Sequence, residues 1–379
     1  MIYLDNAATT QISESVKDKM FEMMTKYYQN PSSIYDSGVA VRMKIEKARE
    51  KIADTIGAQA DEVFFTSSGS ESDNWALRGI ALKYANKGKH IITSKIEHKA
   101  VLKTCEYLEH IGYEINYLDV DADGNVSVQE LEKYLRNDTI LVSIMFANNE
   151  VGTIMKIREL TQAAHAKGAL FHTDAVQAYG HIPINCEELS IDLMSVSGHK
   201  FHGPKGVGFL YKRRGIEIEP LIYGGSQEKN LRAGTESVVN IVGMAQAACE
   251  SYMKIREESI KLYEQRNYLI DTILKTIPNS RLVGSKINRL PNNVCISIKG
   301  VDAIELVDYL GQREICISTG SACNSSSVNI SHVLEAMGLE KESAKGTIRI
   351  SISKYNSISE LEKFVLELKQ AINFLQQIY

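Results

Sequence analysis

Short apolar runs of strand length alternate with amphipathic stretches of helical length from about residue 37 to residue 260. This rhythm is typical of an α/β protein, in which a mainly parallel sheet is covered by helices on both faces. The predicted strands are Glu62–Thr66, His90–Ser94, Glu114–Leu118, Ile140–Phe146, Ala169–Thr173, Leu193–Ser197 and Gly206–Tyr211. Helices are predicted between several of these strands, including Glu71–Asn86, Val101–Ile111 and Ile157–Ala166.

A long predicted helix, Asn240–Leu274, precedes a C-terminal part of a different style. This part reads as an α+β unit whose last helix opens with the capping box Ser357-Ile358-Ser359-Glu360. Its other predicted elements are the strands Asn293–Ile298, Ile315–Ser318 and Thr347–Ser351 and the helices Asp302–Gln312 and Ser331–Met337. Because 379 residues exceed one ordinary core, we predict a large domain over 15–258 and a smaller domain over 1–14 and 259–379. The periodicity alone does not place residues 1–14.

Composition narrows the classes of function that the chain can have. A net charge of -4 argues against a broad nucleic-acid surface, so no direct nucleic-acid partner is expected. No apolar stretch approaches the roughly 20 residues that span a bilayer, and the N-terminus lacks the pattern of a signal peptide. We therefore predict a cytoplasmic protein without a membrane partner. The six cysteines form no CxxC or zinc spacing, so no metal site is expected.

Two predicted strands end in side chains that suit covalent chemistry on a carbonyl group. Lys200 follows the apolar run 191–196 in Ser197-Gly198-His199-Lys200, and Asp174 follows the strand before it. A desolvated lysine amine can form a Schiff base, and an acid placed against a pyridinium nitrogen keeps pyridoxal 5'-phosphate (PLP) an electron sink. The pair points to PLP, although an isolated lysine after a strand is most often a solvated surface residue.

Four further segments carry candidate site residues, each with a plainer alternative. The turn that holds Gly69 and Ser70 opens a helix, where phosphate binds well, but it can equally be an ordinary helix cap. His98 and Asn149 follow other strands and can contact a cofactor, or can be a surface histidine and a turn amide. Arg349 lies in an apolar strand and needs a partner, either a substrate carboxylate or a structural acid.

A Ser-rich loop at about 318–331 carries Cys323 among small polar residues only. Such a loop cannot bury a thiol in apolar packing, so Cys323 is predicted to be exposed and reactive. The other cysteines are predicted to be inert and buried.

Together these segments resemble the cysteine desulfurases of the NifS/IscS type, within the class V aminotransferase group of fold type I PLP enzymes. The resemblance covers nearly the whole chain. It rests on the order and spacing of the motifs Tyr3-Leu4-Asp5-Asn6-Ala7-Ala8-Thr9-Thr10, Asn30-Pro31-Ser32-Ser33, Glu97-His98-Lys99-Ala100-Val101, Asn148-Asn149-Glu150-Val151-Gly152, Asp174-Ala175-Val176-Gln177, Ser197-Gly198-His199-Lys200, Arg232-Ala233-Gly234-Thr235 and Ser321-Ala322-Cys323.

The resemblance implies a role for each matching residue. Lys200 would bind PLP covalently and move protons, Asp174 would pair with the pyridinium nitrogen, and Cys323 would be the nucleophile. His98 would stack on the ring and assist proton transfer, and Asn149 and Arg349 would take the substrate carboxylate. The ring hydroxyl would contact Gln177, and the phosphate would be held by Gly69, Ser70, Ser197, His199 and, from the partner subunit of a homodimer, Thr235.

The implied function is conversion of L-cysteine to L-alanine with sulfur left on Cys323 as a persulfide. Three departures from the family pattern are Asn324 after the cysteine, Ser70 in place of a threonine, and an end at Tyr379 where IscS-type members carry a segment that docks an iron–sulfur scaffold. The sulfur acceptor is therefore either a scaffold for iron–sulfur cluster biosynthesis or a tRNA- or cofactor-thiolation enzyme. The alternatives are a selenocysteine lyase, another fold type I lyase or aminotransferase, and a sulfur-relay partner with vestigial catalysis.

Overall fold

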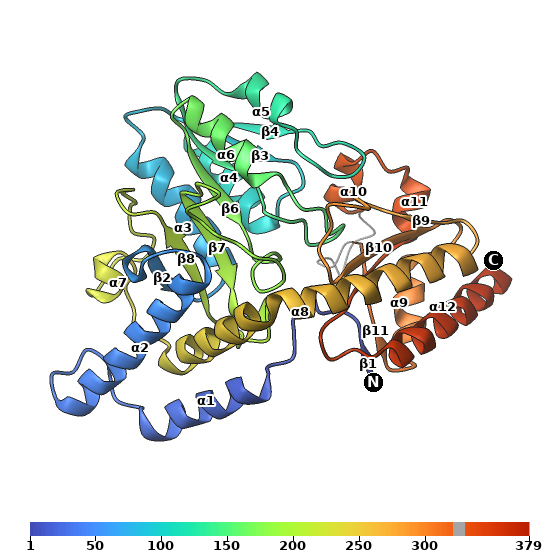
Figure 1. Cartoon of the computed structure of the whole chain (residues 1–379). Helices are drawn as coiled ribbons and strands as arrows, with labels where there is room; N and C mark the ends of the chain where they lie inside the picture. Colours follow the sequence, from blue (N-terminus) through green and yellow to red (C-terminus); the bar gives the residue numbers. More distant parts are fainter. Residues whose placement is uncertain (321–329, 379) are drawn as a thin grey trace.

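The structure is a computed structural model that describes residues 1–320 and 330–378 (Figure 1). Its centre is a seven-stranded sheet of order β2-β8-β7-β6-β5-β3-β4. Neighbouring strands run parallel except at β8, which is antiparallel to both β2 and β7. The strands are β2 (Val63–Thr66), β3 (His90–Ser94), β4 (Glu114–Leu118), β5 (Thr139–Ser143), β6 (Leu170–Asp174), β7 (Leu193–Ser197) and β8 (Gly208–Lys212).

Successive side chains of a strand point to opposite faces of the sheet, and in this sheet apolar side chains lie on both faces. On one face, Ile91, Leu141 and Leu193 pack with α3 and α4. On the other, Ile92, Val142 and other strand residues pack with α2, α6 and the first part of α8. These helices, with shorter ones around them, are α1 (Glu14–Lys26), α2 (Asp36–Thr55), η1 (Ala60–Glu62), α3 (Gly69–Lys83), α4 (Lys99–His110), α5 (Val128–Tyr134), α6 (Ile157–Ala166), η2 (Gly198–Lys200), α7 (Gln227–Asn230) and α8 (Val238–Thr276).

A second, smaller unit is built on a four-stranded antiparallel sheet of order β12-β13-β10-β9. The chain starts beside it, because β1 pairs with β11 and Asp5 bridges to Ser351. One apolar core joins Leu4, Ile350 and Phe364 with the last turns of α8. The elements are β1 (Ile2–Tyr3), β9 (Ser280–Leu282), β10 (Asn293–Ile298), α9 (Ala303–Gly311), β11 (Ile315–Cys316), β12 (Ser318–Thr319), α10 (His332–Ala336), α11 (Lys341–Lys345), β13 (Thr347–Ser351) and α12 (Ile358–Ile378).

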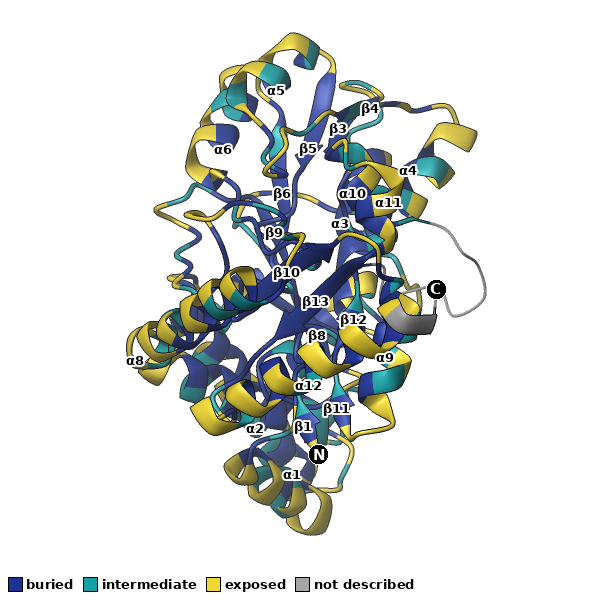
Figure 2. Cartoon of the chain, turned by 90° about the vertical axis from the view of Figure 1, so that its right-hand side faces the viewer, coloured by how far each residue is buried: buried dark blue, intermediate teal, exposed yellow. Residues whose placement is uncertain are grey.

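The long helix α8 connects the two units. Ile241 to Ala248 belong to the core of the large sheet, whereas Leu262 to Ile273 belong to the core of the small one. Figure 2 shows the central strands of both units, such as β5 and β10, buried and the outward faces of α8 and α12 exposed. Among the described residues, no helix is both long and apolar enough to cross a membrane.

Several sequence predictions match these elements closely. The capping box of α12 is present, because the Ser357 N–H donates to Glu360 Oε2 at 2.9 Å and the Glu360 N–H donates to Ser357 Oγ at 3.3 Å. The single strand predicted at Ile315–Ser318 is wrong: the segment divides into β11 and β12, which pair with β1 and β13 in different sheets. The helices α1 and α2 were not predicted individually.

Candidate active site

The candidate site is a cavity of about 320 Å³ at the carboxyl ends of the parallel strands. Ligands of open α/β sheets bind at this edge, because the loops that leave the strands converge there. Most of the predicted site residues line the cavity, although they come from segments far apart in the sequence. They are Gly69, Ser70, His98, Asn149, Asp174, Gln177, Ser197, His199, Lys200 and Arg349.

One end of the cavity is formed by the N-terminus of α3. Gly69 packs so closely that a Cβ atom there would lie 2.5 Å from Val176 Cγ2, so the backbone can approach a ligand where no side chain fits. Ser70 and Ser197 add hydroxyl groups. Burial lowers the pKa of His199 to about 4, which keeps its ring neutral, and His199 Nδ1 lies 3.1 Å from Thr9 Oγ1. A helix N-terminus with hydroxyl and imidazole donors fits a phosphate group.

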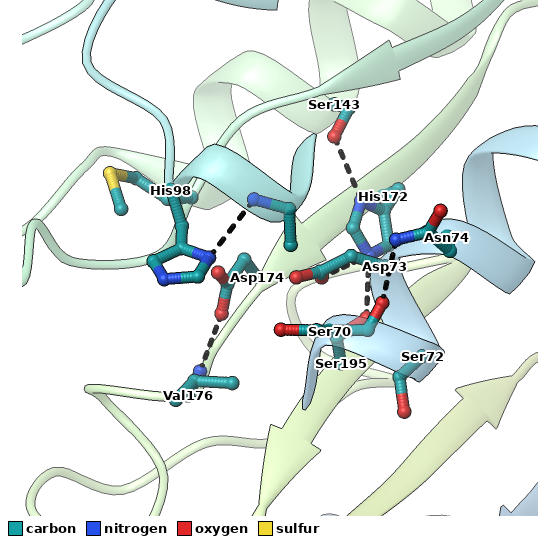
Figure 3. A network of polar contacts seen from close by, with 12 residues as sticks. Ser70, Ser72, Asp73, Asn74, His98, Ser143, His172, Asp174, Val176 and Ser195 are labelled. Carbon is teal, nitrogen blue, oxygen red and sulfur yellow. Dashed lines mark hydrogen bonds and ion pairs between the residues drawn. The ribbon is translucent and has the colours of Figure 1, made fainter. Parts of the chain in front are cut away.

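Asp174 and His98 both line the cavity and lie next to each other (Figure 3). Asp174 ends β6, is buried, and accepts a hydrogen bond from the Val176 N–H at 2.9 Å. Burial raises the pKa of Asp174, while the charges of His98 and Lys200 act in the opposite direction. His98 caps α4: its Nδ1 accepts from the Ala100 N–H at 3.1 Å, so a neutral ring carries its proton on Nε2.

Lys200 reaches the cavity from η2, directly after β7. Its Nζ donates to the carbonyl oxygens of Ala7 at 2.6 Å and Ala8 at 2.9 Å. Gln177 Nε2 donates to the same Ala7 oxygen at 3.0 Å. The segment that follows β1 therefore lies over Lys200 and Gln177, a placement that the sequence analysis did not predict.

Arg349 occupies the end of the cavity that faces the small unit. Its side chain is 2% exposed, Nη2 pairs with Asp5 Oδ1 at 2.9 Å and Nη1 donates to the Asn149 carbonyl at 3.0 Å. Its Nε is buried and has no hydrogen-bond partner among the described residues. The structural ion pair that the sequence left open is thus present, and one donor group remains for a ligand.

Sequence reasoning missed two buried acids around the cavity. Glu97 Oε1 accepts hydrogen bonds from Ser94 Oγ at 2.6 Å and from the Met145 N–H at 3.0 Å, and burial raises the pKa of Glu97 to about 8. Asp73 lies on α3 and lines the cavity directly. The sequence did not reveal Asp73, because its burial depends on the packing of α3 against the sheet, which periodicity does not show.

The structure does not place two of the predicted site residues at the cavity. Cys323, with Asn324, lies outside the described residues. Thr235 is exposed and does not line the cavity of its own chain, while Arg232, three residues before it, pairs with Glu71 on α3 at 2.7 Å.

The five described cysteines do not offer an activated thiol in the cavity. Cys105, Cys186 and Cys295 are buried, whereas Cys249 and Cys316 are half-buried, so the prediction of burial is wrong for these two. Burial raises the pKa of Cys105, Cys186, Cys249 and Cys295, which disfavours the thiolate.

Comparison with known proteins agrees with this geometry. The sequence matches the family "Aminotransferase class-V" over residues 2–364, and the chain belongs to this family. It is 48% identical over 377 residues to a protein named cysteine desulfurase IscS from Dictyoglomus turgidum, covering 100% of this chain and 96% of that relative.

Solved structures give the same result. A NifS-like protein superimposes with a TM-score of 0.94 at 39% identity, covering 99% of this chain and 100% of the other. A structure of SspA in complex with cysteine superimposes with a TM-score of 0.83 at 36% identity, covering 94% and 100%. The expected resemblance and the fold type I architecture are both confirmed.

Proposed function

We propose that this protein is a PLP-dependent cysteine desulfurase that converts L-cysteine to L-alanine and leaves the sulfur on Cys323 as a persulfide. The observation that carries the proposal is the convergence of Lys200, Asp174 and the N-terminus of α3 on one cavity. The relatives named cysteine desulfurase and the SspA complex with cysteine support the choice of substrate.

The residues of the cavity fit PLP. The Gly69 turn with Ser70, Ser197 and His199 would hold the phosphate, and Asp174 would face the ring nitrogen. Gln177 would contact the ring hydroxyl, and Lys200 would bind the aldehyde carbon. When bound, PLP supplies an electron sink for the charge left at Cα of the substrate.

The protein's own residues would then orient the substrate and move its protons. Arg349 and Asn149 would hold the carboxylate at the end of the cavity that faces the small unit. Lys200 Nζ would remove the Cα proton, and His98 would stack on the ring and assist proton transfer. The Cys323 thiolate would attack the substrate sulfur, so that an S–S bond forms as the C–S bond breaks. The carbon fragment takes up one proton at Cβ and regains one at Cα, and leaves as L-alanine.

The assembly and acceptor belong to the same proposal. Thr235 is exposed, as it would have to be in order to reach the phosphate of a partner subunit in a homodimer. The protein would act in the cytoplasm. The persulfide would pass to an acceptor protein, either an iron–sulfur scaffold or a tRNA- or cofactor-thiolation enzyme.

Alanine release from L-cysteine by the PLP-loaded protein, with a thiol reductant, tests this function. We expect turnover in the wild type and in the control Cys316→Ala, and none in Cys323→Ala. Alanine from Cys323→Ala would remove Cys323 as the nucleophile. If neither the wild type nor the variants release alanine from L-cysteine, but the wild type releases selenium from selenocysteine, the protein is a selenocysteine lyase instead.

A further inference from the structure

Asp73 is a fully buried acid without an obvious counter-charge. It lies on α3 at 1% exposure, and its side chain forms part of the cavity wall. Its Oδ1 has no hydrogen-bond partner among the residues that the structure describes. An ionised carboxylate in such a place is costly unless a cation or several donors compensate for it.

The groups around Asp73 do not provide a cation of its own. One oxygen of Asp73, one oxygen of Asp174 and a ring nitrogen of His98 all lie within 4.8 Å of one another. Burial raises the pKa of Asp174, and the charges of His98 and Lys200 partly oppose that rise, whereas neither is among the groups that lower the pKa of Asp73. Burial first, and then the charge of Asp174, raise the pKa of Asp73 well above its usual range. A hydrogen bond from the Ser195 side chain opposes this rise, and Glu97 adds a smaller increase.

His172, on the opposite side of Asp73, is also unable to neutralise it (Figure 3). His172 Nε2 lies 3.7 Å from Asp73 Oδ1, which is too long for a hydrogen bond. Its two ring nitrogens lie instead 2.8 Å from Ser143 Oγ and 2.9 Å from Ser195 Oγ. Burial lowers the pKa of His172 to about 3, so the ring is neutral.

We propose that Asp73 is held as a neutral carboxylic acid next to Asp174, so that the two buried acids carry one proton and one negative charge between them. Two carboxyl groups this close in a dry site cannot both ionise readily, and the proton stays on the one with fewer cationic neighbours. Asp73 is then a positioning residue for Asp174.

Protonation of Asp73 changes the charge of the cavity wall, and the meaning of this change for ligand binding rests on the proposed PLP site. A neutral Asp73 has an O–H group that can donate toward Asp174, whose nearest oxygen lies within 4.8 Å. The wall of the cavity then presents a single negative charge, on Asp174, to the ring nitrogen. A second charge would have no partner in the site, and an apolar residue at position 73 would leave the buried Asp174 without this neighbouring donor.

Infrared difference spectroscopy of the PLP-free protein at pH 7 tests the protonation directly. Wild type minus Asp73→Asn is expected to show a protonated-carboxyl band and no change in the carboxylate bands. The exposed control Asp54→Asn is expected to show the reverse. A carboxylate band in the Asp73→Asn difference would overturn the proposal. This result does not depend on enzymatic activity or on PLP.

PLP titration of the same proteins tests the positioning role. Asp73→Asn retains a donor and is expected to bind PLP within about threefold of wild type. Asp73→Leu is expected to bind about tenfold more weakly and to have an altered visible spectrum. If Asp73→Leu binds PLP with the affinity and visible spectrum of the wild type, Asp73 has no positioning role. The proposal would also be contradicted if the wild type bound one equivalent of a divalent metal ion and Asp73→Asn did not. Failure of the wild type to bind PLP would instead overturn the proposed function and leave the infrared result intact.

Discussion

The two ends of the cavity are built in different ways. At the cofactor end, Asp174 is the last residue of β6, and Lys200 and His98 follow β7 and β3, so each is placed by its own local segment. At the substrate end, Arg349 is held by Asp5, 344 residues away in the sequence, and by the Asn149 carbonyl. The first end depends on one sheet, whereas the second depends on the docking of the two units. Changes at the two ends should therefore have separable effects on cofactor and substrate.

The largest expected effect is at the cofactor end. Lys200→Ala removes the amine that binds PLP and moves the Cα proton, so turnover should fall by at least about a thousandfold. Borohydride reduction followed by mass spectrometry should find no PLP attached to the variant. Lys167→Ala, at an exposed lysine after α6, is the control and should match the wild type. Normal turnover in Lys200→Ala would disprove its catalytic role.

A substitution at the substrate end should change the KM for L-cysteine. Arg349→Lys keeps the charge but loses the forked geometry that binds a carboxylate, so KM for L-cysteine should rise by about tenfold or more. The visible spectrum of bound PLP should stay as in the wild type. A loss of PLP that matches the rise in KM would show that the two ends are not separable.

Asp5→Asn provides a finer comparison at the same end. The change removes the counter-charge of a buried arginine but leaves the shape of the side chain. We expect a smaller rise in KM than in Arg349→Lys, together with a lower melting temperature, because a buried charge loses its partner. An unchanged melting temperature would mean that Asp5 does not stabilise Arg349.

The raised pKa of Glu97 predicts how the stability of the protein changes with pH. Its folded pKa of about 8 lies above its ordinary value of 4.5, so the folded protein binds more protons than the unfolded chain between these values. The stability that this carboxyl contributes is complete below about pH 4.5 and is lost as pH rises through about 8. Glu97→Gln should remove this loss, so its melting temperature relative to wild type should rise from pH 5 to pH 9. A constant difference would contradict the raised pKa.

The smallest effect is expected at Thr235, which is exposed and outside the cavity of its own chain. If Thr235 contacts the phosphate across a dimer interface, Thr235→Ala should weaken PLP binding by about threefold without altering the monomer fold. Equilibrium dialysis of the dimer would measure this change. If Thr235→Ala binds PLP as tightly as the wild type, Thr235 does not contact the phosphate.

The contrast between the two ends also explains what the sequence could predict. Lys200 and Asp174 were found because a polar residue directly after an apolar strand is a local signal. The Asp5–Arg349 pair was not found, because no local pattern joins residues 344 positions apart. Asp73 was missed for a different reason: its burial depends on the packing of α3 against β7 and β6, which periodicity does not show. The splitting of Ile315–Ser318 between two sheets likewise depends on the tertiary pairing of β1.

A single-turnover experiment tests the central claim most directly. The PLP-loaded protein is mixed with less than one equivalent of L-cysteine without reductant. The alanine released is quantified, and the masses of the intact protein and of its peptides are measured by mass spectrometry. We predict one alanine for each sulfur atom gained, with that sulfur on the peptide that contains Cys323. Alanine without sulfur on Cys323, or sulfur on another cysteine, would contradict it.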